Sequence, residues 1–404
     1  MPASPHPTSA TPSMRWLPGL LLATFVIGTD DFIIAGILPE LAVAFDVTEA
    51  AAGQLVAVFS LVYAVAAPVM ALFTARLSRR ALIVGGLTVF ALINAATVLA
   101  PSYAALMALR VAAALVGATV TPAAFATAGG LAPPERSGRA IGVVAAGLTV
   151  SLIVGVPVGS WLGGLFGWQA TFVLVATLTV AAVFITGLTL PALPGTTGTG
   201  LRERLQLLRR PSVLSCVAGT VFGATAGFMP YTFIVPVVTD LTGVERTLIP
   251  VTIGVIGIAG AIGTVAGGRL NDRWGPDRTI LTLMAVMATT TVVLSLAGPL
   301  FGGDAPYWLF LTVLAVWGAA VWAYNPPMNA RALRLAGDAG TEAVALNTSG
   351  LYIGIAVAGA LGGVALSVGD GALVLGLSGA VVVLGMLFMS LAVRRFPCSV
   401  SGDQ

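Results

Sequence analysis

The sequence predicts an all-α integral membrane protein, with twelve transmembrane helices arranged as two pseudo-symmetric six-helix bundles. Of its 404 residues, 57% are hydrophobic and only 9% are charged, whereas soluble domains contain about 25% charged residues. Apolar runs of about 20 residues, long enough to cross a hydrocarbon core of about 30 Å, recur along nearly the whole chain. The longest polar stretch, from Pro194 to Pro211, divides these runs into two sets of six.

Breaks in the hydrophobic pattern delimit the twelve predicted helices. Pro, Gly and short polar clusters separate the apolar runs, as at 100–102, 132–136, 164–168 and 369–371. The first run is too long for the core of a signal peptide and contains two acidic residues, so we expect it to be retained as the first helix. The predicted helices cover residues 16–40, 52–74, 80–100, 103–129, 138–164, 169–192, 213–239, 247–268, 279–300, 306–329, 342–367 and 371–393.

The same pattern predicts the domain organisation. We expect a disordered N-terminal tail, a first bundle, a linker, a second bundle and a C-terminal tail over residues 1–15, 16–192, 193–212, 213–393 and 394–404. The bundles echo each other, because ALFTARLSRR from Ala71 follows the second helix as GRLNDRWGPD from Gly268 follows the eighth. Internal repeats of this kind place the substrate site of many transporters where the repeats meet.

The arginines predict the orientation of the chain in the membrane. All 19 basic residues are Arg, and all except Arg110 and Arg246 fall on one side of this helix map. Cytoplasmic loops carry an excess of Lys and Arg. We therefore expect both termini, the linker and the C-terminal tail to be cytoplasmic.

Composition argues against several other classes of function. The Arg residues lie in short loops, which is how topology is set rather than how a nucleic acid is bound. The single His, His6, lies in the N-terminal tail, and Cys216 and Cys398 do not make a disulfide framework. No metal-ligand cluster, nucleophile elbow or buried His/Cys pair is evident, so an intramembrane enzyme is disfavoured. We expect no catalytic residues, metal, cofactor or nucleic-acid partner.

Two adjacent acidic residues, Asp30 and Asp31, lie near the middle of the first predicted helix. A charged Asp at the bilayer centre costs roughly 2.5–3.5 kcal/mol, so such acids face a wet cavity, pair or stay protonated. Adjacent helix positions point about 100° apart, and two carboxylates this close favour a proton on at least one. We predict that this pair takes up and releases a proton. The alternative is structural, with one Asp bonded to backbone or paired permanently with Arg110.

Arg110, in the fourth predicted helix, is the one basic residue within a predicted span. It needs a negative partner, and the deeply placed candidates are Asp30 and Asp31. An Asp–Arg pair that opens when the Asp is protonated is a two-state device. A fixed pair that holds the first and fourth helices together is the alternative.

Small residues form stripes on three predicted helices. They recur every four residues on the fifth and eleventh helices and every three on the eighth. Such stripes allow close helix packing, and Pro157 is tolerated within a bundle. We expect plain helix packing, with the further possibility that the stripes join the two bundles and slide during transport. The residues are Gly147, Ser151, Gly155, Gly159 and Gly163; Gly350, Gly354, Ala358 and Gly362; and Gly254, Gly257, Gly260 and Gly263.

Aromatic and amide side chains concentrate in the second bundle. Cavities with aromatic walls and few polar groups suit flat or amphiphilic organic ligands, although aromatic belts at the membrane interface are an alternative explanation. We predict that the substrate contacts Phe228, Tyr231, Trp322, Asn325, Asn347 and Tyr352.

These motifs together resemble the major facilitator superfamily, and within it the twelve-helix drug:proton antiporter branch, which also includes sugar, nucleoside and purine exporters. The resemblance covers nearly the whole chain. It rests on GTDDFIIAGILPELA with AAGQLVAVFSLVYAVAAP, on MALRVAAALVGA, on GVPVGSWLGGLFGWQATF and on GRLNDRWG. The chain departs from the family pattern at Ala71, Ala75 and Ser78, where Gly, Asp and Gly are usual, and at Ala114, where many drug exporters have Gly.

The resemblance implies roles for individual residues. Asp31 occupies the usual acidic position and would carry the proton, and Arg110 would couple protonation to conformation. Gly155, Pro157 and Gly159 would belong to the antiporter motif of the fifth helix. Asp30 is an extra acid, so the choice of proton carrier between the two Asp stays open.

We therefore expect proton-driven efflux of a small antibiotic-like or drug-like compound by alternating access. The alternative cargo is a sugar, nucleoside or purine base, and a non-transporting receptor of the same fold is a further possibility. The expected setting is a bacterial plasma membrane, with the protein acting as a monomer and its partners being the small-molecule substrate, protons and the lipid bilayer.

Overall fold

The computed structural model describes residues 14–398, with the exception of 75, 134–135, 192–206 and 208. The described residues form helices and no strands, which confirms the predicted all-α class. Most of the predicted linker and most of both tails lie outside the described residues, so the predicted domain bounds stay a prediction.

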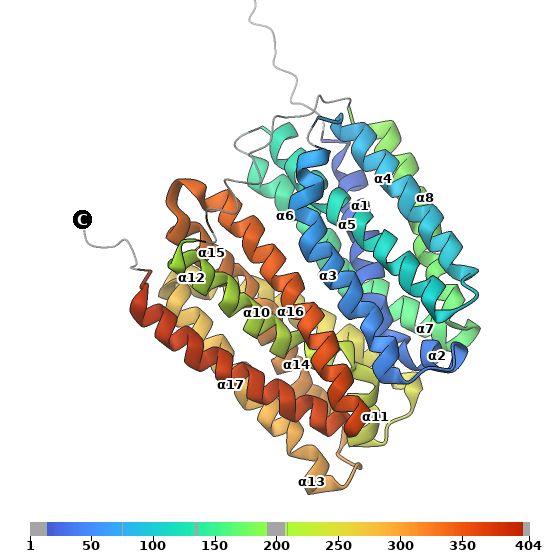
Figure 1. Cartoon of the computed structure of the whole chain (residues 1–404), viewed down its shortest axis with the longest axis vertical. Coiled ribbons are helices and arrows are strands. Elements are labelled where there is room, and N and C mark those ends of the chain that lie inside the picture. The colour runs from blue at the N-terminus through green and yellow to red at the C-terminus, as the bar shows by residue number, and fades with distance from the viewer. Residues whose placement is uncertain (1–13, 75, 134–135, 192–206, 208, 399–404) are drawn as a thin grey trace, which may run out of the picture.

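The first half of the protein runs from the first helix to residue 189 and is coloured blue to green in Figure 1. Its helices are α1 (Leu17–Phe32), η1 (Ile33–Gly36), α2 (Leu38–Ala44), α3 (Glu49–Phe73), α4 (Arg79–Val98), α5 (Tyr103–Leu131), α6 (Ser137–Val150), the π-helical η3 (Ser151–Gly155), α7 (Val156–Phe166) and α8 (Trp168–Thr189).

The second half begins at residue 211 and is coloured yellow-green to red, beside the first half in Figure 1. Its helices are α10 (Pro211–Thr232), α11 (Ile234–Thr242), η4 (Arg246–Leu248), α12 (Ile249–Ser295), α13 (Ala297–Phe301), α14 (Tyr307–Ala323), α15 (Asn325–Ala336), η5 (Gly337–Ala339), α16 (Gly340–Val368) and α17 (Gly371–Arg395).

The helices of the described residues account for twelve membrane crossings. Eleven helical segments are long and apolar enough to span a bilayer. One of them, around α12, is long enough for two crossings, because the chain breaks at Gly275 with φ 76° and ψ 166°. Pro276 follows, and its ring lacks the N–H that would continue the helix. The eighth and ninth predicted helices are therefore the two parts of α12, and the predicted count of twelve is confirmed.

Several crossings are interrupted near the middle of the bundle. The sequence predicts one continuous helix over 16–40, but α1 ends at Phe32 and passes through a 3₁₀ turn before α2 begins at Leu38. Pro39 contributes to the break, because its ring has no N–H to donate to the carbonyl four residues earlier. The break places Asp30 and Asp31 in the last turn of α1. Comparable breaks separate α10 from α11 at Phe233 and α14 from α15 at Tyr324.

The two halves meet along two pairs of helices. One pair is α3 with α16, which run side by side in Figure 1; a methyl group on Gly359 would lie 3.0 Å from the Ala57 Cβ. The other pair is the η3–α7 segment with the first part of α12, where Gly254 faces Pro157 and Gly257 faces the Leu152 carbonyl. We call these two contact surfaces the seam.

Most of the glycine stripes do not lie in the seam. A Cβ on Gly155 would collide with Thr29, and one on Gly159 with Ile33, so the helix-5 glycines pack against α1 and η1 within the first half. Gly350, Gly354 and Gly362 likewise face α10 and Phe233 within the second half. The prediction that these stripes join the two halves is therefore wrong for them. Of the helix-8 stripe, Gly254 and Gly257 reach the seam, whereas Gly260 and Gly263 pack against α14. The other faces of the seam carry Pro157 on α7 and, outside the predicted stripe, Gly359 and Gly363 on α16.

Candidate functional site

A buried ion pair joins α1 to α5 in the first half. The Arg110 Nη1 donates to the Asp30 Oδ2 over 2.7 Å, and both side chains are buried. The Arg110 guanidinium carbon also lies 4.3 Å from the centroid of the Phe59 ring on α3, a cation–π arrangement. Of the two candidate partners of Arg110, the structure therefore pairs Asp30.

The site has one more acid than base. Asp31 is 3% exposed and has no Arg bonded to it, so ionising both acids beside Arg110 gives a formal charge of −1. Asp30 Oδ1, Asp31 Oδ1 and the Nε and Nη2 of Arg110 are buried without a hydrogen-bond partner among the described residues. An uncompensated buried charge is costly and is relieved by a proton or by a cation. The arrangement is suited to binding one positive charge.

Asp31 contacts the second half of the protein. The Tyr352 hydroxyl on α16 donates to the Asp31 Oδ2 over 3.1 Å. The Tyr352 ring stacks on Tyr63 of α3, with centroids 3.8 Å apart and an interplanar angle of 19°. The two tyrosines thus bring one helix from each half to the acid on α1.

An aromatic cluster lies beside Asp31. Phe32 stacks on Phe228 with a centroid distance of 5.7 Å, and Trp322 lies 5.5 Å from Phe228 and 5.4 Å from Tyr231. A narrow cavity between the halves, with no room for a water molecule, lies at this cluster. It is lined by Asp31, Phe32, Ala35, Val56, Phe228, Tyr231, Thr232 and Ile355.

The predicted amides lie in a separate network. Asn347 accepts from the Thr220 hydroxyl over 2.6 Å and donates to the Asn329 Oδ1 over 2.9 Å, and Asn329 donates to the Asn325 Oδ1 over 2.6 Å. This chain joins α10, α15 and α16 within the second half. Neither Asn325 nor Asn347 lines the cavity at Asp31.

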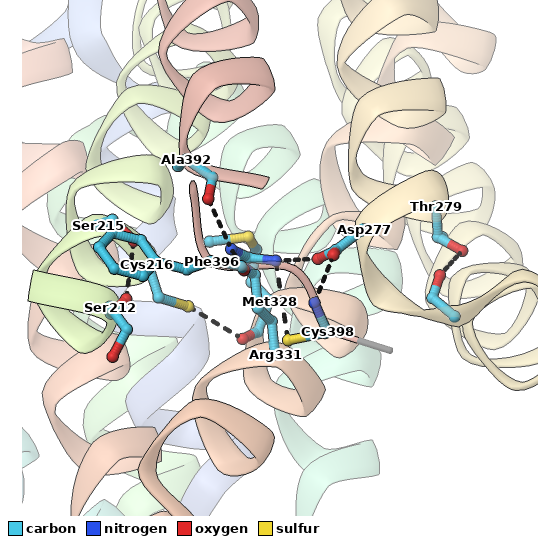
Figure 2. Close-up of polar contacts among 11 residues, drawn as sticks. Ser212, Ser215, Cys216, Asp277, Thr279, Met328, Arg331, Ala392, Phe396 and Cys398 are labelled. Atoms are coloured by element: carbon cyan, nitrogen blue, oxygen red, sulfur yellow. Dashed lines mark hydrogen bonds and ion pairs between the residues drawn. The ribbon is translucent and has the colours of Figure 1, made fainter. Parts of the chain in front are cut away.

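A second buried Arg–Asp pair lies in the second half (Figure 2). Arg331 on α15 is 0% exposed and donates to Asp277, directly after the break in α12. It also donates to the Phe396 carbonyl over 2.8 Å, and the Asp277 Oδ2 accepts from the Cys398 backbone N–H over 2.8 Å. The pair therefore fixes the chain that follows α17. The sequence analysis had counted Arg331 among the loop arginines.

The sequence reasoning missed four contributors to the site. Phe32 and Tyr63 fall in the motifs that carry the family resemblance, but neither was singled out. Thr220 and Asn329 complete the amide network, and Asn329 is four residues from Asn325, a spacing that puts both on one helix face.

Comparison with known protein families assigns the chain to one of them. The model of the Major Facilitator Superfamily matches residues 20–359. The chain belongs to the major facilitator superfamily, and it is a multi-pass membrane transporter.

Relatives include a bacterial resistance protein and a bacterial efflux transporter. The chain is 34% identical to a chloramphenicol resistance protein of Streptomyces lividans, over 85% of this chain and 88% of the relative. It is 28% identical to a probable sugar efflux transporter of Pasteurella multocida, over 84% and 83%. The fold matches a D-xylose-proton symporter with a TM-score of 0.76 at 15% identity, covering 93% of this chain and 97% of that one.

Proposed function

We propose that the protein is a proton-coupled efflux transporter that exports a small drug-like compound by alternating access of its two halves. The observation that carries the proposal is the surplus acid: Asp31 is buried beside a complete Asp30–Arg110 pair and lines the cavity between the halves. A proton on Asp31 neutralises the site, and its release restores the charge. The charge of the cavity wall therefore depends on whether Asp31 carries a proton.

The two aspartates have different roles in this proposal. Asp30 is held by Arg110 at 2.7 Å and keeps the guanidinium compensated. Asp31 has a free Oδ1 and only a tyrosine partner, so it is the acid that takes up and releases the proton. Arg110 keeps unpartnered N–H groups, with which it stabilises ionised Asp31 through space.

The walls of the cavity favour a drug-like cargo. Three aromatic rings and three aliphatic side chains line it, with Thr232 and the Tyr231 hydroxyl as the neutral polar groups. Sugars and nucleosides need several hydrogen-bonding partners, whereas amphiphilic compounds bind apolar, aromatic walls. The chloramphenicol resistance relative agrees with this choice.

Export of a sugar, nucleoside or purine base is the second candidate. It is favoured by the sugar efflux relative and by the amide network of Thr220, Asn325, Asn329 and Asn347. That network would have to exchange its internal bonds for bonds to substrate.

The proposed setting is a bacterial plasma membrane, with both termini cytoplasmic and the protein acting as a monomer. The Arg-rich loops support this orientation.

Everted membrane vesicles test the proposal. Chloramphenicol added to energised vesicles should release protons in exchange and reduce an acid-inside gradient, and Asp31→Asn should abolish this response while gradient-independent substrate exchange persists. Asp304→Asn, which changes an exposed acid, is the matched control and should behave as wild type. Unchanged gradient-driven export by Asp31→Asn would overturn the proposal. A response to xylose but not to chloramphenicol would favour the second candidate.

A further inference from the structure

We infer that Tyr352 is a positioning residue through which the second half of the protein responds to the charge on Asp31. This inference rests on the proposed function, because it assumes that Asp31 gains and loses a proton. It gives Tyr352 a role other than the substrate contact predicted from the sequence.

Tyr352 makes polar contacts across the boundary between the halves. In the described part of the chain, hydrogen bonds that involve a side chain and cross between the halves include one from Gln54 to the Gly359 carbonyl over 3.4 Å and one from the Tyr352 hydroxyl to the Asp31 Oδ2. The Tyr352 side chain is also hydrogen-bonded to that of Tyr63. Of these contacts, the one to Asp31 ends on a carboxyl group whose charge changes when it gains or loses a proton.

The surroundings hold Tyr352 in place for this contact. Its ring is stacked on Tyr63 at 3.8 Å, and its side chain is also hydrogen-bonded to that of Tyr63, so the orientation of its hydroxyl is fixed. The residue is not among those that line the cavity. Its hydroxyl is already engaged by Asp31, which leaves it poorly placed to bind substrate.

The strength of the bond depends on the proton at Asp31. A hydrogen bond from a neutral donor to a carboxylate is about twice as strong as one between neutral groups. The free Oδ1 of Asp31 can accept a proton without displacing Tyr352 from Oδ2. Protonation therefore weakens the link from α1 to α16 without breaking it, and it lowers the resistance of the halves to separation at this point.

Other ionisable groups face Asp31 from several elements. They are Asp30 on the same helix, Arg110 on α5, Tyr63 on α3, Tyr231 on α10 and Tyr352 on α16. Asp30 and Arg110 belong to the first half and move with Asp31. Of the two tyrosines from the second half, Tyr352 holds the hydrogen bond, and the Tyr231 hydroxyl has no partner among the described residues.

Distance measurements between the halves test the inference. Spin labels at the exposed positions Arg139 on α6 and Arg334 on α15, in a Cys398→Ser background, should report a pH-driven change in the distance distribution of the wild type. Tyr352→Phe keeps the stacked ring and removes the donor. In the wild type, the ratio of the two distance populations should change between acidic and basic pH. We expect Tyr352→Phe to make this pH-dependent change about tenfold smaller, which corresponds to the loss of one charge-assisted hydrogen bond.

Tyr63→Phe is the matched control that separates the two polar contacts of Tyr352, because it removes the hydrogen bond between Tyr63 and Tyr352 and leaves the Tyr352 hydroxyl as the donor to Asp31. It should keep the pH response of the wild type. Replacing Tyr352 by 4-aminophenylalanine restores a donor on the same ring and should restore the response. Transport should show the same difference between the variants. Tyr352→Phe should lower kcat for gradient-driven export and leave KM unchanged, and Tyr63→Phe should change neither.

The possible outcomes separate this inference from the proposed function. A pH response in Tyr352→Phe equal to that of Tyr63→Phe would overturn the role of Tyr352, even if Asp31→Asn abolishes coupling. Retained coupling in Asp31→Asn would overturn the proposed function itself. Gradient-independent substrate exchange by Tyr352→Phe would show that the variant is folded. If it fails to fold, 4-methylphenylalanine at position 352, which fills the space of the hydroxyl without supplying a donor, replaces it in the comparison with Tyr63→Phe and should lose the pH response.

Discussion

The two buried Arg–Asp pairs differ in how completely their hydrogen bonds are satisfied. In the second half, the Arg331 Nη1 and Nη2 both have partners and only its Nε is unpartnered among the described residues, and both Asp277 oxygens accept bonds. In the first half, Arg110 has one bond, two of its nitrogens are unpartnered, and a second acid lies next to its partner. A balanced pair with nearly all of its hydrogen bonds made fixes structure, whereas a less saturated pair with a surplus acid has a charge that can change.

Their positions agree with this contrast. Asp30 and Asp31 lie in the last turn of α1, beside the cavity between the halves. Asp277 follows the break between the two crossings of α12, is 14% exposed, and with Arg331 binds the segment after α17. Charge balance and saturation, rather than burial, distinguish the pair that we propose to be functional. Each prediction below changes one member of a pair.

Breaking the first pair should have the largest effect. Arg110→Gln leaves two buried acids without a cation, and removing one partner of a buried pair costs about 3–5 kcal/mol. We expect a lower yield of folded protein, a lower melting temperature in detergent and no gradient-driven export. Thermal unfolding followed by size-exclusion chromatography measures the first two effects.

A double variant separates folding from transport in that experiment. Arg110→Gln with Asp30→Asn removes both charges of the pair and should recover most of the stability, but not the export. If Arg110→Gln alone is as stable as wild type, the Asp30–Arg110 ion pair does not stabilise the folded protein as proposed here.

Breaking the second pair should affect stability and leave coupling intact. Arg331→Gln leaves Asp277 partly exposed and still bonded to the Cys398 N–H, so we expect a cost of about 1–3 kcal/mol. Export per folded molecule, and its dependence on the proton gradient, should equal that of the wild type. Loss of coupling in a folded Arg331→Gln protein would remove the distinction between the two pairs.

The sequence predicted the helices of the fold better than their contacts. Hydrophobic length and Pro/Gly breaks are local properties, so the twelve crossings could be predicted to within a few residues. The rotation of each helix about its axis is set by tertiary packing. For this reason the sequence could not say that the helix-5 glycines face α1, or that Gly359 rather than Gly354 reaches the seam.

The same limit applies to the candidate site. An intramembrane Arg needs an acidic partner, and this argument predicted that Arg110 pairs with Asp30 or Asp31. Adjacent residues on a helix point about 100° apart, so only one of them can face Arg110 directly. The structure shows that this partner is Asp30. Arg331 was hidden for a different reason: it lies near the end of a span, where a buried arginine and a topology-setting one look alike. The contact between Tyr352 and Asp31 joins residues 321 positions apart, which no local pattern predicts.

The smallest expected effect is local, at the segment that the second pair binds. Burial raises the pKa of the Cys398 thiol, and Arg331 and Arg334 lower it only in part. A raised pKa means less thiolate at a given pH, so alkylation of Cys398 by N-ethylmaleimide should be slow at pH 7 and should accelerate as the pH rises. Asp277→Ala removes the acceptor of the Cys398 N–H and should speed alkylation about tenfold by releasing this segment.

Asp272→Ala is the matched control for that change, because Asp272 is an exposed acid five residues earlier in the chain. It should leave the alkylation rate unchanged, and mass spectrometry distinguishes Cys398 from the buried Cys216, which should react only after denaturation. Equal rates in Asp277→Ala and Asp272→Ala would mean that the second pair does not hold the segment after α17. The pair would then stabilise only α12 against α15, and the contrast with the first pair would rest on charge balance alone.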